Sequence, residues 1–226
     1  MIFRTASRFV MIVLVSLIAI ADPTHGSIDC LNSDRQKDVF DLKAHKECTN
    51  DPFVVAQDDS IKQAEKLLGL SADQVTFIGC NAASFSTRMT ELEQPFHFQI
   101  LYSTLYARRD CISPLLHEIA HVYQLNRAGS PDKLLQSLRQ SVQRVELGAD
   151  FLAGLLAVRL GLNPGEFQKN LALVGSYDEE SADAHGLPAD RTSAFRYGYF
   201  YDPKSGSLES QYADFQKNLF GQIKNT

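Results

Sequence analysis

Apolar positions along the first half of the chain repeat with a helical period in one stretch and with strand-like patterns in two others. Residues 58–70 carry apolar side chains three and four positions apart and end at Gly69, which predicts a helix. Residues 75–78 form a short apolar run, and residues 96–102 alternate apolar and polar side chains, so both predict strands. Residues 81–94 follow neither period and predict a loop or a hairpin arm.

Helical patterns dominate the second half of the chain. Ser113 as N-cap, Pro114 at the first helical position and Gly129 as the C-terminal cap predict one helix. Ser130-Pro131 then begin a second helix, predicted to run through Leu160. Further helices are predicted over residues 163–174, 191–197 with Asp190 as the cap, and 208–220. These patterns predict an α+β, mainly helical domain with a small sheet before the Ser113 helix.

The N-terminus has the pattern of a secretory signal peptide. Two arginines precede an apolar run over residues 9–20, and residues 19–21 have the small-x-small form of a cleavage site. An uncleaved membrane anchor is the alternative, but the run is too short to span a bilayer comfortably. We therefore expect residues 1–21 to be removed and residues 22–226 to form one exported domain, periplasmic or extracellular and not inserted in the membrane. Within this domain, residues 22–57 are predicted to be loop-rich, with a short helix near 36–45.

Composition and charge bear on which classes of partner the protein can bind. Hydrophobic residues make up 44% of the chain and charged residues 22%, which is typical of a globular protein. The formal charge is −5 and would become −7 without the two leader arginines. Because basic residues are scattered and the balance is acidic, nucleic acid is not an expected partner.

Four cysteines lie after the leader, at Cys30, Cys48, Cys80 and Cys111. In an oxidising compartment an even number favours two disulfides, and three pairings exist. Local pairing, Cys30–Cys48 with Cys80–Cys111, is our prediction. The absence of a C-x-x-C spacing argues against a zinc site made of these thiols.

The strongest chemical signal is the run His117-Glu118-Ile119-Ala120-His121. Residues four apart lie on one face of a helix, so His117 and His121 can direct two imidazoles at one zinc ion. Glu118 lies beside them and would act on the metal-bound water. The alternative is that two histidines on an amphipathic helix are satisfied by ordinary hydrogen bonds.

A zinc site of this kind needs a third protein ligand. A histidine six positions after His121 would supply it in one known pattern, but Arg127 occupies that position. Glu146 and Asp150 lie four apart on the next predicted helix and share a face. We expect Glu146 to be the third ligand and Asp150 to accept a hydrogen bond from the outer N–H of a ligating histidine. A solvated Glu/Asp pair on an exposed helix face is the alternative.

These motifs resemble those of the gluzincin metallopeptidases, in particular the bacterial neutral zinc metallopeptidase family. The similarity rests on residues 117–121 and on 146–154, whose sequence begins Glu-Leu-Gly-Ala-Asp. Residues 185–191 and 195–199 are similar to a later segment of the family with the pattern His-Gly…Arg…Phe…Gly-Tyr. In the middle of this segment the chain departs from the family pattern. The resemblance covers about residues 110–200. It implies a zincin-like fold, a zinc cofactor and peptide or protein substrates. It also implies that the zinc ligands are His117, His121 and Glu146, that Glu118 is the base, and that Asp150 binds a ligating histidine from its outer side.

The function expected from these residues is a zinc metallopeptidase that hydrolyses peptide bonds through a zinc-bound water activated by Glu118. His185 is the candidate donor to the carbonyl oxygen that becomes negative in the transition state, or else a loop histidine bonded locally. Behind it we expect Tyr177, Tyr197 and Arg191.

Two other functions are consistent with the same residues. The protein could be a non-catalytic periplasmic binding or scaffold protein that retains a zinc site. It could also be a zinc hydrolase of a non-peptide amide. An intact Glu118 favours an enzyme, because a purely structural site needs no base. Residues 76–103 are expected to select the substrate, with the strand at 96–102 as an edge that pairs with an extended peptide.

Overall fold

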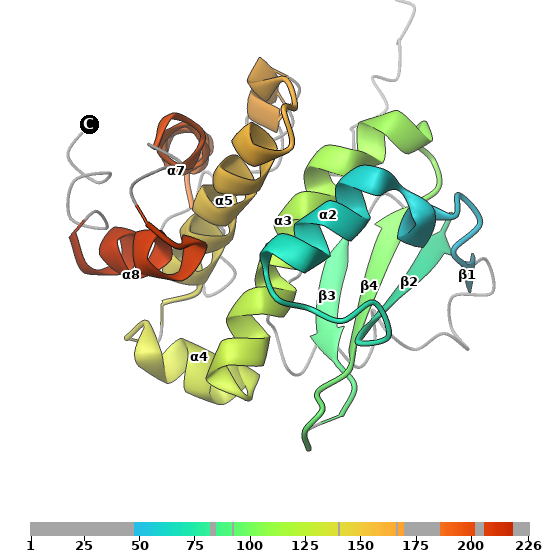
Figure 1. Cartoon of the computed structure of the whole chain (residues 1–226), viewed down its shortest axis with the longest axis horizontal. Coiled ribbons are helices and arrows are strands. Elements are labelled where there is room, and N and C mark those ends of the chain that lie inside the picture. The colour runs from blue at the N-terminus through green and yellow to red at the C-terminus, as the bar shows by residue number, and fades with distance from the viewer. Residues whose placement is uncertain are drawn as a thin grey trace, which may run out of the picture.

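The computed structural model describes residues 48–81, 85–91, 93–139, 141–165, 167–169, 186–201 and 206–218 (Figure 1). Most of these residues are helical, and a small sheet precedes the first long helix. The elements in chain order are β1 (Cys48–Asn50), the 3-10 helix η1 (Val55–Gln57), α2 (Asp59–Leu67), β2 (Val75–Cys80), β3 (Ser86–Met89), β4 (Phe98–Ser103), α3 (Arg108–Ala128), α4 (Pro131–Ser137), α5 (Val142–Arg159), α7 (Pro188–Phe200) and α8 (Leu208–Asn218). The α+β, mainly helical prediction is confirmed.

The sheet is mixed and has the strand order β1-β2-β4-β3. β2 and β4 are parallel, with Val75 opposite Phe98, whereas β1 and β3 each pair antiparallel with their neighbours. The strands predicted at 75–78 and 96–102 are confirmed as β2 and β4. Because β3 pairs with its outer side, β4 is not the edge strand that we expected. The segment predicted as a loop or hairpin arm contains β3, which is at the edge of the described sheet.

Helix α3 lies between the sheet and helices α5, α7 and α8 (Figure 1). α2 packs on α3 on the sheet side of the molecule, and α5, α7 and α8 lie on the side of α3 away from the sheet. One hydrophobic core runs through both parts, because α3 is buried on both sides. Its members include Phe98 and Ile100 from the sheet, Leu116 from α3, and Phe151 and Phe195 from the outer helices.

The start of α3 differs from the sequence prediction. The helix begins at Arg108, so Ser113 is not its N-cap and Pro114 lies inside it. The first turns are held by tertiary contacts, since Cys111 is fully buried and its thiol donates to the Ser103 carbonyl oxygen of β4. The predicted end is confirmed, because Gly129 caps the helix at a φ of 80°.

The long helix predicted from Ser130 to Leu160 is two helices. Ser130 does cap α4, with Pro131 in the first turn, but α4 ends at Ser137. α5 then begins after Ser141, whose hydroxyl accepts a hydrogen bond from the Arg144 backbone N–H. The turn between them allows α5 to run back along α3 in roughly the opposite direction (Figure 1).

The other helix predictions are mostly confirmed. α2 and α8 lie where the periodicity places them, and residues 164–165 and 167–169 are helical within the predicted 163–174 helix. α7 begins earlier than predicted, after Leu187 rather than Asp190, with Pro188 in its first turn. The leader and the helix near 36–45 lie outside the described residues. Within the described residues, no helix is both long and apolar enough to span a bilayer.

The predicted disulfide pairing is wrong for the residues described. Cys48 is bonded to Cys80, and the two are direct neighbours in the antiparallel β1–β2 register. Cys111 is a free, buried thiol. Strand pairing therefore decided the bond: it brings the Cys48 and Cys80 Cα atoms to 4.1 Å. Cys30 lies outside the described residues.

Glycines let α7 approach α5 closely. A Cβ on Gly154 of α5 would overlap the carbonyl oxygen of Phe195, and a Cβ on Gly198 of α7 would overlap that of Phe151. The two helices thus touch backbone to backbone. This contact brings Arg191, in the first turn of α7, over the side of α5 that faces α3.

Candidate metal centre

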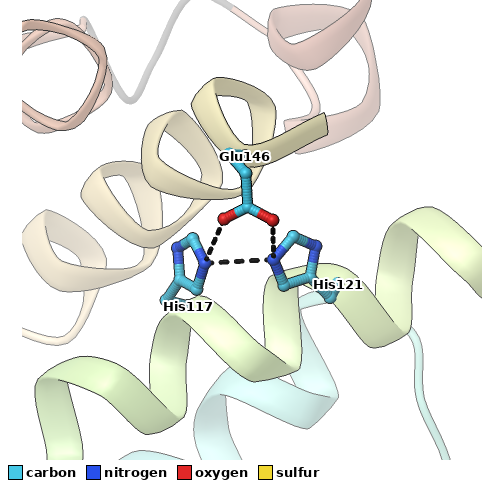
Figure 2. Close-up of side chains that lie close together, drawn as sticks. All are labelled: His117, His121 and Glu146. Carbon is cyan, nitrogen blue, oxygen red and sulfur yellow. Dashed lines mark hydrogen bonds and ion pairs between the residues drawn. The ribbon is translucent and has the colours of Figure 1, made fainter. Parts of the chain in front are cut away.

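Helices α3 and α5 bring two histidines and a glutamate to one point (Figure 2). His117 and His121 lie one turn apart on α3, and Glu146 faces them from α5. The two Nε2 atoms are 3.0 Å apart, and the Glu146 carboxylate oxygens lie 3.2 Å from Nε2 of His117 and 3.5 Å from Nε2 of His121. All three side chains are buried. The predicted clustering of these residues is therefore present in the structure.

The outer nitrogens of both histidines face acceptors. Nδ1 of His117 is 2.9 Å from Oδ1 of Asp150, and Nδ1 of His121 is 2.8 Å from Oε1 of Gln124. A carboxylate or an amide oxygen can only accept, so each Nδ1 carries a proton. In the neutral form of each ring, Nε2 is then the atom with the lone pair.

This arrangement collects electron pairs at one buried point. Two Nε2 lone pairs and a carboxylate repel one another at these distances unless a cation, either a proton or a metal ion, lies among them. Ligand atoms of a tetrahedral zinc with bonds of about 2.0–2.1 Å are about 3.3 Å apart. The three observed separations lie on both sides of this value. The His117, His121 and Glu146 group could therefore hold a metal ion.

The charges around His117 favour its protonated form when no metal is bound. Burial lowers the pKa of His117, but the Asp150 and Glu146 carboxylates outweigh burial and raise the pKa to about 9. Burial also raises the pKa of Asp150, and Arg191 and His117 together bring it below its ordinary value. Asp150 is thus an anion that binds its histidine in either state.

Arg191 is fully buried and binds Asp150 with two hydrogen bonds. Nε lies 2.8 Å from Oδ2, and NH2 lies 2.9 Å from Oδ1. The same NH2 is 3.3 and 3.4 Å from the two ring nitrogens of His117, so it lies over the ring rather than on the axis of the Nε2 lone pair. It is also 3.6 Å from Oε2 of Glu146. We expected Arg191 behind His185, and the structure shows it bound to Asp150, the carboxylate that contacts His117.

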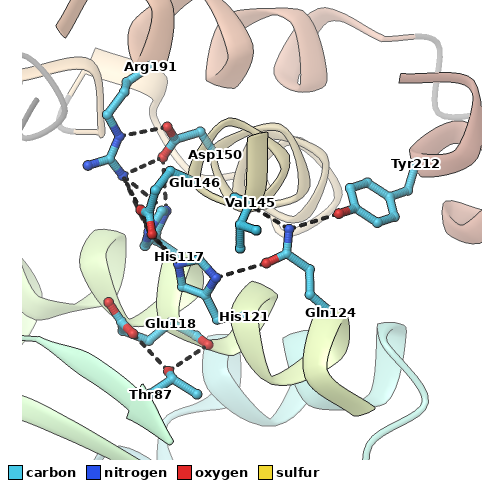
Figure 3. Close-up of polar contacts among 10 residues, drawn as sticks. All are labelled: Thr87, His117, Glu118, His121, Gln124, Val145, Glu146, Asp150, Arg191 and Tyr212. Atoms are coloured by element: carbon cyan, nitrogen blue, oxygen red, sulfur yellow. Dashed lines mark hydrogen bonds and ion pairs between the residues drawn. The ribbon is translucent and has the colours of Figure 1, made fainter. Parts of the chain in front are cut away.

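The Glu118 side chain leaves α3 toward strand β3, whereas His117 and His121 point toward Glu146 of α5 (Figure 3). The Glu118 carboxylate is 0% exposed, and the Thr87 hydroxyl lies 2.8 Å from Oε2 and 3.0 Å from the Glu118 carbonyl oxygen (Figure 3). Thr87 belongs to edge strand β3. Sequence reasoning missed Thr87, because its segment was predicted to be a loop and a lone threonine gives no signal.

Gln124 is a second residue that sequence reasoning missed. It lies one turn after His121 and contacts its Nδ1, while its amide nitrogen donates to the Val145 carbonyl oxygen and to the Tyr212 hydroxyl (Figure 3). The three-residue spacing from His121 is a signal that could have found it. Nothing in the sequence connects it to Tyr212.

The described residues include only some of the other predicted site residues. His185 and Tyr177 lie outside the described residues, so their roles stay predictions. Tyr197 is 40% exposed and its ring contacts Phe151. Arg127, at the position of an absent histidine ligand, pairs instead with Glu209 of α8 at 2.6 Å.

Comparisons of the chain with protein-family models, with curated proteins and with solved structures find no match. The resemblance to the gluzincin metallopeptidases stays a prediction from the motifs.

Proposed function

We propose that the protein is a zinc-dependent peptidase. His117, His121 and Glu146 hold the zinc, and Glu118 is the general base. The observation that carries this proposal is the convergence of two Nε2 lone pairs and a carboxylate beside a second carboxylate that is not part of the ligand group. A purely structural site has no need of Glu118.

The donor set favours zinc over other common ions. Two imidazole nitrogens and one carboxylate oxygen at near-tetrahedral spacing are a ligand set of catalytic zinc, with the fourth position left for water or substrate. Calcium and magnesium prefer sites made of oxygen ligands. Arg191 and Asp150 support this set by fixing the His117 ring from its outer side.

A bound zinc ion would polarise the substrate carbonyl and make water easier to deprotonate. Glu118 then takes the proton from the attacking water and passes it to the leaving amine. The Thr87 hydroxyl lies 2.8 Å from Oε2 of Glu118 and orients the carboxylate that we assign to this transfer. His185 remains our candidate donor to the negative oxygen, on sequence grounds alone.

Peptides are the substrate class that the sheet favours. β3 is at the edge of the described sheet and can pair through its backbone with an extended peptide. Thr87 of this strand touches Glu118, so a peptide along β3 would pass the base. This role replaces the one that we expected for β4. Export remains part of the proposal, and the Cys48–Cys80 disulfide is consistent with an oxidising compartment.

The burial of the cluster favours a second candidate function. His117, Glu118, His121 and Glu146 are all buried, as in a structural metal site of a binding or scaffold protein. Hydrolysis of a non-peptide amide uses the same groups as peptide hydrolysis and differs only in substrate. Glu118 distinguishes these functions, because both enzymes need a general base and a binding protein does not.

Metal content and Glu118→Gln test the proposal together. We expect about one zinc per purified chain by elemental analysis, lost in His121→Ala. Glu118→Gln, which is nearly isosteric and keeps an oxygen facing Thr87, should retain the zinc and lose hydrolysis of a mixed peptide library. Retained hydrolysis in Glu118→Gln would refute the role of the base. Zinc bound by a wild-type protein that cleaves neither peptides nor other amides would support the binding protein.

A further inference from the structure

Helix α8 packs on α5 and also contacts the second half of α3, next to the metal centre, through side chains. Arg127 of α3 pairs with Glu209 of α8, and the ring of Tyr123 packs edge-on against the ring of Tyr212 at 6.1 Å. Between these contacts the Tyr212 hydroxyl accepts a hydrogen bond from Gln124 at 2.8 Å. A helix distant in sequence thus reaches a residue that touches His121.

The partners of the Gln124 amide decide its orientation. The Val145 backbone carbonyl, 2.9 Å away, has no proton to donate, so the NH2 group of Gln124 must face it. The second N–H of that group points to the Tyr212 hydroxyl. The amide oxygen is left facing Nδ1 of His121, in a site where Gln124 is 1% exposed. A flipped amide would set the Gln124 oxygen against the Val145 carbonyl oxygen, two acceptors, and its NH2 group against the protonated Nδ1 of His121, two donors.

We propose that Gln124, oriented by Val145 and by Tyr212 of α8, is a positioning residue that keeps a proton on Nδ1 of His121 and so directs the Nε2 lone pair at the metal. The inference rests on the metal site of the proposed function. It gives the two histidines different supports: a charged Asp150–Arg191 pair behind His117 and a neutral amide behind His121.

Gly148 of α5 provides independent support. A Cβ at this position would lie 2.7 Å from Nε2 of Gln124 and 2.8 Å from the Tyr212 hydroxyl oxygen. Any other residue would therefore push apart the two groups that meet there. Gly148 lies within the continuous helix α5, where glycine is normally unfavourable, and the Gln124–Tyr212 contact explains why this position has no side chain.

The test compares variants of the whole purified protein with two measurements. The first is the Nδ1-bound proton of His121, followed by NMR with ¹⁵N-labelled histidine, in metal-free and in zinc-loaded protein. The second is the zinc dissociation constant by competition with a chromophoric chelator. In the wild type we expect a slowly exchanging Nδ1 proton in both states.

Gln124→Met removes the acceptor while keeping a side chain of similar shape. It should expose the Nδ1 proton to exchange and weaken zinc binding about 10- to 100-fold. Gln124→Glu restores an oxygen acceptor and should bind zinc more tightly than Gln124→Met, although it sets a carboxylate against the Val145 carbonyl. A merely structural role would give the reverse order, since the buried carboxylate disturbs packing more.

Tyr212→Phe and Tyr123→Phe form a matched pair at the same α3–α8 contact, and both keep the ring. Tyr212→Phe should speed exchange of the His121 Nδ1 proton and weaken zinc binding. Among the contacts described, the Tyr123 hydroxyl bonds only Arg127, so Tyr123→Phe should leave the exchange rate and the zinc affinity unchanged. These small changes keep the test valid if Gln124→Met does not fold.

The two proposals fail in different ways. A wild-type protein that binds no zinc but has a protected Nδ1 proton that Tyr212→Phe exposes would refute the proposed function and support the positioning role. Zinc bound through Nδ1 of His121, or an Nδ1 proton that none of the Gln124 and Tyr212 variants changes, would overturn the positioning role and leave the metal site intact.

Discussion

The raised pKa of His117 predicts that the metal-free protein loses stability as the pH rises from 7 to 9. Its pKa is about 9 in the folded protein and 6.5 without the fold, so the folded state holds the proton more tightly. The stabilisation is complete below about pH 6.5 and disappears as the pH passes about 9. A shift of this size corresponds to about 3 kcal/mol, of which about 2 kcal/mol is lost between pH 7 and pH 9.

Urea unfolding of chelator-treated protein at several pH values measures this loss. With a slope of about 2 kcal/mol per molar, the midpoint should fall by about 1 M. Two other groups with raised pKa values titrate mainly at the edges of this window. Burial raises the pKa of Glu65 to about 7 and that of the Cys111 thiol to about 11, so each adds only a small fall between pH 7 and pH 9, which the His117→Gln control also shows.

His117→Gln is the control, because it removes the titrating group from the same buried position. Its free energy of unfolding should change far less between pH 7 and pH 9 than that of the wild type. An equally steep fall in His117→Gln, or a flat profile in the wild type, would refute the assignment of a raised pKa to His117.

The same proton gives zinc binding the opposite dependence on pH. Zinc must displace the proton from His117, so its affinity should rise between pH 7 and pH 9 while the stability of the metal-free protein falls. Zinc binding measured by calorimetry near pH 7, in buffers with different ionisation enthalpies, should release about one proton from this group. Uptake of protons on binding would contradict the geometry.

Three other predictions concern the support of the site and the sheet. Asp150→Asn should weaken zinc binding about 10- to 100-fold, as measured by chelator competition, because the Nδ1 proton of His117 loses its anionic partner; unchanged affinity would show that the pair is dispensable. Gly154→Ala should lower the free energy of unfolding by about 1–3 kcal/mol or more, because the added methyl group overlaps the α7 backbone. The control Lys62→Ala, at an exposed position of α2, should change the free energy of unfolding little. Reduction of the Cys48–Cys80 disulfide should cost about 4 kcal/mol for its separation of 32 residues, read from urea curves with and without reductant; coincident curves would exclude the bond.

The sequence alone was sufficient for features that depend on local spacing. His117 and His121 lie four residues apart, and so do Glu146 and Asp150, which places each pair on one face of whatever helix carries it. The alternation before Ser103 and the apolar run from Val75 were equally local, and both segments are strands. Such patterns are written in consecutive residues, so no partner is needed to read them.

Features that depend on distant partners were predicted poorly. Strand β3 has little alternation of its own and forms by pairing with β4, which thereby loses its place at the edge. The partner of Cys80 was decided by the β1–β2 register and not by closeness in sequence. Pro114 lies inside α3 because a buried Cys111 holds the preceding turn against β4.

The candidate site divides in the same way. The candidate ligands and the proposed base could be named from two short motifs, since a zinc site of this kind requires those residue types at those spacings. The contacts that orient these residues could not be predicted. Thr87 and Gln124 were missed, and Arg191 was named but expected behind His185, because only the packing of β3, α8 and α7 brings the three side chains to Glu118, His121 and Asp150. A hydrogen bond between residues tens of positions apart leaves no period in the sequence, and tertiary packing alone decides it.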